Sequence, residues 1–239
     1  MKYLNILLFI GMIVMNYLAN ALPLNNKATG ELSDSYPNLF VPAGITFSIW
    51  GVIYLLLAVY CVLQFTSPDQ VIITNIAWAF ASTCLLNALW IVCWHYVKLP
   101  LSLLVMLSLL VILIYVNISI HELPIGLIKA AFGIYLGWIC VATIANITAL
   151  LVHYQWNGFG ISHEIWTITL IAAAALIASL SLFRFDNPYI GLVVIWALTG
   201  IIIKRIGDYR SIVIAASVAI AVVAAVTLVG FFRKKLGIV

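Results

Sequence analysis

The side chains that could do chemistry in this chain are neutral and aromatic, and they recur at helical spacing on three apolar stretches. Within each stretch they stand three, four, seven or eight residues apart, which places them on one face of a helix. The three sets are Phe47, Trp50 and Tyr54; Asn87, Trp90 and Trp94; and Trp138, Ala142 and Asn146. Indole and amide groups on facing helices can line a pocket for a flat, largely apolar ligand that forms a few hydrogen bonds. The same spacing also fits aromatic side chains that fill a bundle and Asn side chains that bond across it.

No arrangement typical of an enzyme accompanies these side chains. The sequence has no Ser-His-Asp pattern, no paired carboxylates and no phosphate-binding loop. His153, His163 and Glu164 lie in one short segment, but no two His share a helical turn, so we expect no metal site there. The four Cys fall inside apolar stretches without C-x-x-C spacing, as small apolar residues do. We therefore expect no catalytic residues, no required cofactor and no enzyme activity.

The composition identifies the kind of protein that carries these side chains. Of 239 residues, 66% are hydrophobic and 8% are charged, and the net charge is +4. A soluble domain needs about 25% charged residues, so a soluble globule is excluded. Nucleic acid is excluded as a partner because the positive charge is too sparse. The long apolar runs predict an all-α, polytopic helical membrane bundle whose partners include membrane lipids.

The sequence contains eight apolar stretches between polar breaks. The length of each is close to or above the length that one membrane crossing requires. They are Leu4–Leu22, Ala43–Phe65, Val71–Tyr96, Leu101–Ile120, Pro124–Val152, Glu164–Phe183, Pro188–Ile203 and Ser211–Phe232. An even number of crossings places both termini on one side, and the cluster Arg233-Lys234-Lys235 favours the cytoplasm for the C-terminus. The first stretch, which ends near Ala19-Asn20-Ala21, also fits a cleavable signal peptide.

The few charged residues within the stretches indicate which functions the chain can have. No carboxylate lies near the middle of a stretch; Lys129 lies about a turn and a half from the start of its own and can snorkel to the interface. Ion-coupled carriers usually keep a charge at membrane depth, so its absence counts against a transporter.

Small residues four apart predict closely packed helices. These pairs are Gly133 and Gly137, Ala215 and Ala219, and Ala221 and Ala225.

Three of the stretches resemble motifs of the TspO/MBR family, the tryptophan-rich sensory proteins and the translocator protein. The quoted segments occur in the family's order. They are Pro42-Ala43-Gly44 with Phe47, Trp50 and Tyr54; Asn87-Ala88-Leu89-Trp90 with Trp94; and Tyr135-Leu136-Gly137-Trp138 with Ala142 and Asn146. The resemblance covers about residues 1–152. It implies a five-helix core there, and residues 153–239 then form about three additional C-terminal transmembrane helices.

The resemblance also implies a function. The family binds tetrapyrroles, cholesterol and synthetic aromatic ligands between its helices, so Trp50, Asn87, Trp138 and Ala142 are expected to line a pocket close to Asn146. Tyr54 and Trp90 are further candidates on the same faces. Two departures from the family pattern are Val41 in place of one Pro of a pair and the lack of a basic residue after Tyr154, where the family has a cholesterol motif.

We expect an integral, multi-pass protein in the cell membrane of a prokaryote. It would bind a porphyrin-like or haem-type ligand as a sensor or carrier, with a second copy of the chain as a further partner. Two other functions stay open: a small secondary transporter of a hydrophobic or amphipathic metabolite, whose three extra helices complete a translocation path, and an enzyme that degrades a bound tetrapyrrole.

Overall fold

The computed structural model describes residues 1–22 and 24–232, and within this part the chain is helical without strands. Its long helices follow the eight apolar stretches. They are α1 (Lys2–Ala21), α3 (Ile49–Thr66), α4 (Gln70–His95), α5 (Leu99–Ser119), α6 (Leu127–His153), α7 (His163–Phe185), α8 (Tyr189–Arg205) and α9 (Arg210–Phe232). The shorter elements are α2 (Thr29–Asp34) and the 3-10 turns η1 (Leu24–Asn26), η2 (Gly44–Ser48) and η3 (Gly158–Gly160). The predicted all-α membrane bundle is confirmed.

Among the described residues, seven helices are long and apolar enough to cross a membrane by length and composition. The eighth, α8, has 17 residues, a length of about 26 Å at 1.5 Å per residue, against a hydrocarbon core of roughly 30 Å. It begins directly after Pro188, whose missing N–H does no harm at a helix start. The predicted stretch Pro188–Ile203 is therefore a helix, and it is the shortest of the set.

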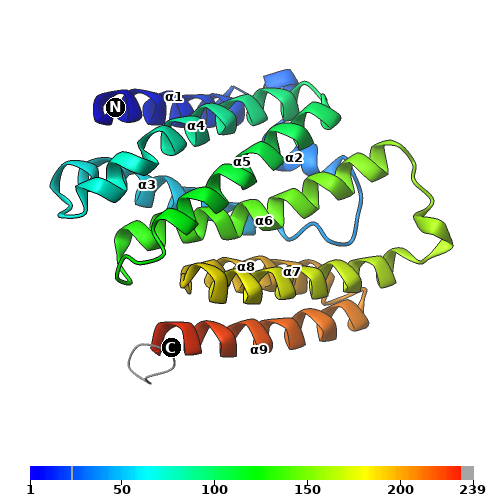
Figure 1. Cartoon of the computed structure of the whole chain (residues 1–239). Coiled ribbons are helices and arrows are strands. Elements are labelled where there is room, and N and C mark those ends of the chain that lie inside the picture. The colour runs from blue at the N-terminus through cyan, green and yellow to red at the C-terminus, as the bar shows by residue number, and fades with distance from the viewer. Residues whose placement is uncertain (23, 233–239) are drawn as a thin grey trace.

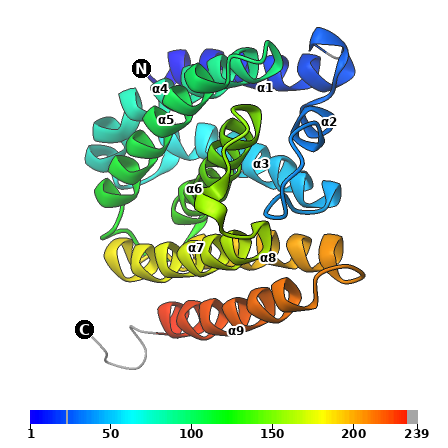
Figure 2. The same cartoon turned by 90° about the vertical axis from the view of Figure 1, so that its right-hand side faces the viewer.

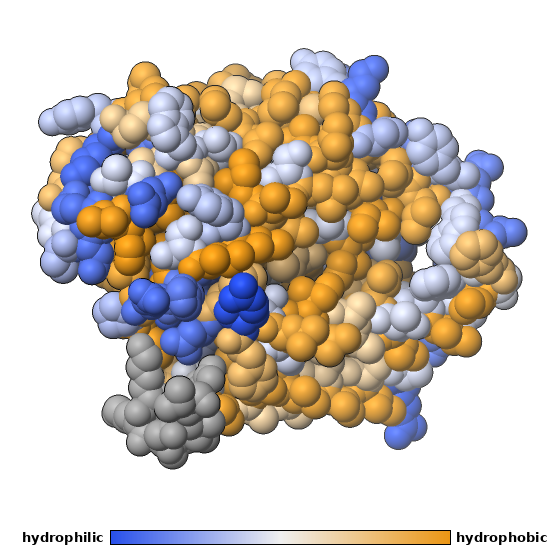
Figure 3. Space-filling model, in the orientation of Figure 1, coloured by the Kyte–Doolittle hydropathy of each residue, from blue (hydrophilic) through white to orange (hydrophobic). Residues whose placement is uncertain are grey.

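The long helices run roughly along one direction, and the chain returns to its starting side. In Figure 1 the start of α1 and the red end of α9 lie at the same end of the bundle, at the left of the view. The space-filling view shows the molecule from the same side as Figure 1. Hydrophobic residues lie across the middle of this face, and hydrophilic residues gather toward its two ends (Figure 3). This distribution suits an apolar membrane interior between two aqueous sides. The cluster Arg233-Lys234-Lys235 lies outside the described residues.

Helix α6 is the central element of the bundle. It packs against α3, α5 and α8 (Figures 1 and 2). Its glycines make the contact with α8 possible: a Cβ at Gly137 would stand 2.8 Å from the carbonyl oxygen of Ile190, and one at Gly133 would overlap the side chain of Asn187. The expected role of Gly133 and Gly137 in close helix packing is thus confirmed.

Of the alanine pairs of the last helix, Ala219 packs as expected and the others do not. Ala221 and Ala225 are exposed, and Ala215 is only partly buried. The buried stripe of α9 lies on a neighbouring face, against α7 and α8, and consists of Ile212, Ala216, Ala219, Val223, Thr227 and Gly230. Spacing alone does not choose between faces in a helix that is apolar all round, because each face has small residues to offer.

Lys129 also differs from expectation. Its side chain does not snorkel outward but is fully buried at one end of the bundle. The ammonium donates to the carbonyl oxygens of His121, at 2.7 Å, and Asp186, at 2.8 Å, and it lies 3.4 Å from the Asp186 carboxylate. The charge therefore joins the α5–α6 loop to the α7–α8 turn, because turn carbonyls inside the protein replace the water that snorkelling would reach.

Candidate functional site

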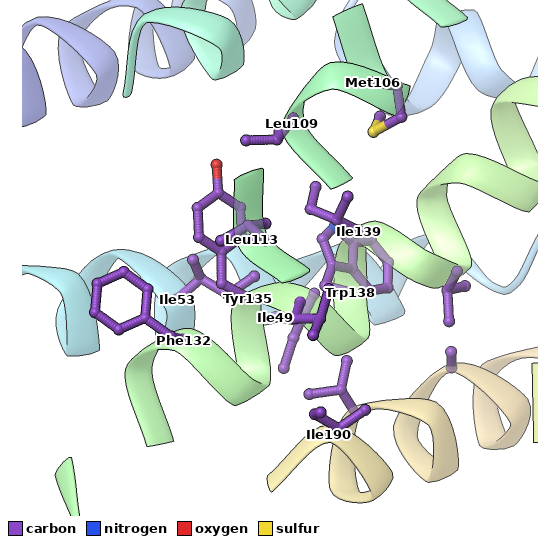
Figure 4. Close-up of a cluster of buried hydrophobic side chains, with 14 of the residues drawn as sticks. Ile49, Ile53, Met106, Leu109, Leu113, Phe132, Tyr135, Trp138, Ile139 and Ile190 are labelled. Atoms are coloured by element: carbon purple, nitrogen blue, oxygen red, sulfur yellow. The ribbon is translucent and has the colours of Figure 1, made fainter. Parts of the chain in front are cut away.

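A small cavity lies where the three aromatic faces converge, and five of the seven predicted site residues line it. These five are Trp50 of α3, Trp90 of α4, and Trp138, Ala142 and Asn146 of α6. Phe47 and Trp94 contribute two more aromatic walls. Figure 4 shows Trp138 rising from α6 into the same buried cluster as Ile49 of α3 and Ile139 of α6. The helical spacing read from the sequence therefore did bring side chains from three helices to one place.

The aromatic rings of the cavity pack against one another. Trp138 meets Phe47 edge-on with ring centroids 5.7 Å apart and meets Trp50 edge-on at 6.3 Å. Elsewhere in the lining, Trp90 and Trp94 are stacked at 5.7 Å with an angle of 18° between their planes. Offset stacks and edge-to-face pairs are the favoured geometries of aromatic rings. The cavity thus has flat apolar walls on two sides.

Three buried hydrogen-bond donors of this lining have no partner among the described residues. They are the indole Nε1 atoms of Trp90 and Trp138 and the side-chain Nδ2 of Asn146. The Oδ1 of Asn146, in contrast, lies 3.2 Å from the Ser102 hydroxyl, which also donates to the carbonyl oxygen of Leu99 at 2.9 Å. Most buried polar groups in proteins are satisfied, and a buried donor without a partner costs about 1–3 kcal/mol. These three donors all lie around one cavity.

Two predicted site residues lie outside the cavity lining. Asn87 is buried in a chain of hydrogen bonds: its Oδ1 accepts from Asn16 of α1 at 2.8 Å, and its Nδ2 donates to the Tyr135 hydroxyl at 3.0 Å. These bonds occupy the amide on both sides and tie α1, α4 and α6 together. Tyr54 stacks on Trp50 at 5.5 Å and faces a separate groove.

A cover over the cavity comes from the segment between α1 and α3, which the sequence predicts to be a polar break between helices. Thr29 and Ser33 of α2, followed by Val41 and Pro42, complete the lining. The only local signal for α2 is Glu31, whose carboxylate accepts from the backbone N–H of Ala28 at 2.9 Å, as in a capping box.

Buried His95 at the end of α4 anchors this cover. Its Nδ1 lies 3.0 Å from the carbonyl oxygen of Leu24, to which only a protonated Nδ1 can donate. Its Nε2 then accepts from the Thr29 hydroxyl at 2.9 Å. Tyr36 also packs against Trp94 and against His153, with ring centroids 6.1 Å apart in both pairs, and burial raises the pKa of its hydroxyl. His153 thus contacts aromatic rings rather than His163.

The aromatic walls separate the cavity from a larger groove between α1, α2 and α3. The cavity has a volume of about 40 Å³, whereas the groove holds about 650 Å³. Both spaces are lined by Thr29, Phe47 and Trp50, so these three residues form the partition. Asn16 and Tyr54 line the far side of the groove.

The comparisons with known proteins bear on the whole chain. A family model described as TSPO-like protein matches residues 2–229, from α1 into α9. No curated protein and no solved structure matches the chain. The match continues past the five helices whose motifs resemble the TspO family, so the C-terminal helices fall within the same family pattern. With seven helices suited to a membrane, this chain is a multi-pass integral membrane protein that belongs to the TSPO-like protein family.

Proposed function

We propose that the protein binds a hydrophobic, planar, porphyrin-like molecule in the aromatic cavity between α2, α3, α4 and α6, and that it acts as a sensor or carrier in the cell membrane of a prokaryote. The observation that carries the proposal is the set of three unpartnered donors, from Trp90, Trp138 and Asn146, around one aromatic-lined space. A planar ring suits the flat indole walls, and oxygen acceptors at the ring's edge suit the donors.

The present cavity is too small for such a ligand. Ligand pockets hold roughly 300–1,000 Å³, against about 40 Å³ here and about 650 Å³ in the adjoining groove. Phe47 and Trp50 separate the two spaces and are only partly buried. Rotation of these two side chains would join the cavity to the groove and give a space of the required size. Binding therefore includes an aromatic rearrangement, and we expect it to be slower than diffusion.

The function is binding rather than catalysis in this proposal. The cavity lining contains no carboxylate, no His and no Cys, and its hydroxyl side chains are those of Thr29 and Ser33. A sensor or carrier needs only a reversible site, which aromatic walls and hydrogen-bond donors supply.

The test compares two porphyrins that differ in oxygen acceptors. Protoporphyrin IX carries carboxylates, whereas octaethylporphyrin has none, and quenching of tryptophan fluorescence reports both affinities in detergent. Asn146→Leu removes one donor while keeping the side-chain size. We expect it to weaken protoporphyrin IX binding about tenfold or more, as for one hydrogen bond to a charged group, and to leave octaethylporphyrin unchanged.

The control is Asn75→Leu, because Asn75 is exposed on α4 and lines neither the cavity nor the groove. If wild type and Asn146→Leu bind both porphyrins equally well, the unpartnered donors do not contact the ligand, and the proposed site is wrong.

A further inference from the structure

A second, larger cavity lies outside the aromatic site, where the C-terminal end of α6 and the N-terminal part of α7 meet residues 37–40. Its volume is about 510 Å³, within the range of small-molecule pockets. Its walls are mostly apolar and come from Leu39 and Phe40, from Ile147 and Leu151 of α6, and from Leu170 of α7. The helices α7 and α8, which lie beyond the five-helix core, help to build this space and the one beside it.

A polar chamber of about 330 Å³ adjoins this apolar cavity. Both spaces are lined by Pro37, Asn38, Leu39 and His163, so they share one wall. The chamber also contains Lys204 and Arg205, from the last turn of α8, together with Asp34. Lys204, Arg205 and Asp34 place two positive charges and one negative charge at the chamber, for a net charge of +1 from these three side chains.

The cations of the chamber keep donors available for an anion. Arg205 uses its Nε to donate to the carbonyl oxygen of Leu39 at 3.1 Å and its Nη2 to donate to that of Asn38 at 2.8 Å. Because a guanidinium has five N–H groups in a fixed fork, further donors remain for phosphate oxygens. Lys204 pairs with Asp34 at 2.8 Å and neutralises that carboxylate.

The rim of the apolar cavity has the composition of a membrane interface. Trp156 and Trp166 both line it, with ring centroids 5.2 Å apart. The Nε1 of Trp166 donates to the carbonyl oxygen of Gly158 at 2.9 Å, which fixes its ring at the α6–α7 loop. Tryptophan gathers where the acyl chains of a bilayer meet the headgroups. An apolar cavity at this level, beside a cationic chamber, fits a molecule with a hydrocarbon tail and an anionic head.

We propose that these joined spaces form a binding site for one membrane phospholipid with an anionic headgroup. An acyl chain occupies the apolar cavity between α6 and α7, and the phosphate lies in the chamber beside Arg205 and Lys204. A second copy of this chain fits the site less well, since the space is a two-part hollow with a charged end rather than a flat apolar face. The site does not depend on the proposed porphyrin function, because the acyl-chain cavity shares no residue with the aromatic cavity and the chamber shares Ser33 and Val41 with it but neither cation.

The experiment measures lipid binding to the full chain in detergent by native mass spectrometry, with phosphatidylglycerol and phosphatidylcholine of the same acyl chains. Wild type is expected to hold one phosphatidylglycerol more tightly than phosphatidylcholine. Leu151→Trp fills the apolar cavity and should weaken both lipids about tenfold or more. Its matched control is Leu180→Trp, because Leu180 is 60% exposed on α7 and lies outside the cavity.

Charge is tested separately by Lys204→Gln, which lowers the net charge facing the chamber from +1 to 0. It should weaken phosphatidylglycerol about fivefold, as for one interfacial cation, and leave phosphatidylcholine unchanged. The control Arg210→Gln removes an exposed charge at the same end of the bundle that does not line the chamber.

Equal affinity of wild type for the two lipids would overturn the proposal, as would unchanged affinity in Leu151→Trp. A change from dimer to monomer in Leu151→Trp would show that a second copy covers the cavity, and would also overturn it.

Discussion

Trp196 of α8 donates its indole N–H to the backbone carbonyl oxygen of Thr46 at 2.9 Å. This bond joins two residues 150 positions apart in the chain, and Thr46 lies one residue before the cavity wall Phe47. A second bond runs beside it, from the backbone N–H of Ala43 to the carbonyl oxygen of Gly200 at 3.0 Å. At Gly200 a Cβ would overlap the side chain of Thr46, so only glycine permits this close approach. The C-terminal helices therefore hold the segment that leads into the aromatic site.

Trp196→Phe should remove this hydrogen bond while keeping most of the ring contact. We expect the free energy of unfolding to fall by about 1 kcal/mol, the usual contribution of one such bond. Thermal unfolding in detergent measures the change. Trp78→Phe is the control, because Trp78 is 66% exposed on α4. Equal loss in the two variants would mean that the bond to Thr46 adds nothing to stability.

Lys129→Met should destabilise the protein more strongly. The substitution leaves the carbonyl oxygens of His121 and Asp186 without their charged donor and leaves the Asp186 carboxylate beside an apolar side chain. Breaking a buried ion pair by removing one partner costs about 3 kcal/mol or more.

A double-mutant cycle with Asp186→Asn identifies the ionic part of this cost. Because Asp186→Asn keeps the backbone acceptor and removes only the charge, the double variant should lose less than the two single losses added together. Strict additivity would show that the carboxylate has no coupling to Lys129.

The sequence alone was sufficient to predict the long helices and much of the cavity lining. Runs of about 20 apolar residues locate helices with little ambiguity, and Trp138, Ala142 and Asn146 share a face whatever their neighbours are. The partner of Asn87 was not predictable, because nothing local indicates that Asn16 on α1 would face α4. The cover over the cavity depends on His95, some 70 residues along the chain, and no short-range pattern announces it. Long-range pairings of this kind decide which polar groups remain free for a ligand.

The number of crossings predicts that both termini lie on one side of the membrane. The start of α1 and the end of α9 lie at the same end of the bundle, which includes the short helix α8 (Figure 1). Reporter fusions after residue 3 and after residue 239 should therefore both be active on the same side. Reporters on opposite sides would mean that one helix fails to cross, and α8 would be the first to examine.

Truncation after Val152 should lower yield and thermal stability. It removes the α8 surface that covers Gly133 and Gly137, and it removes the donors that Arg205 and Trp196 supply to the first loop. The resulting exposure of packed helix faces and loss of several hydrogen bonds would be visible as aggregation in size-exclusion chromatography. A truncated chain that is equally stable and monodisperse would show that residues 1–152 fold without the C-terminal helices.

Ala142→Leu should block the aromatic site without disturbing the fold. Ala142 lies one turn beyond Trp138 on α6, lines the cavity and is only partly buried. The added carbons would occupy much of a space of about 40 Å³ and keep Phe47 and Trp50 from rotating inward over a ligand.

Removing one wall by Trp138→Ala should cost about 1–3 kcal/mol of binding, which is roughly 5- to 150-fold in affinity for protoporphyrin IX. Ala142→Leu should lose at least as much affinity while its unfolding temperature stays near that of wild type. Trp78→Ala, on the exposed face of α4, serves as the control and should bind normally. If all three variants bind protoporphyrin IX like wild type, the indole side chains serve only to pack α3, α4 and α6 together.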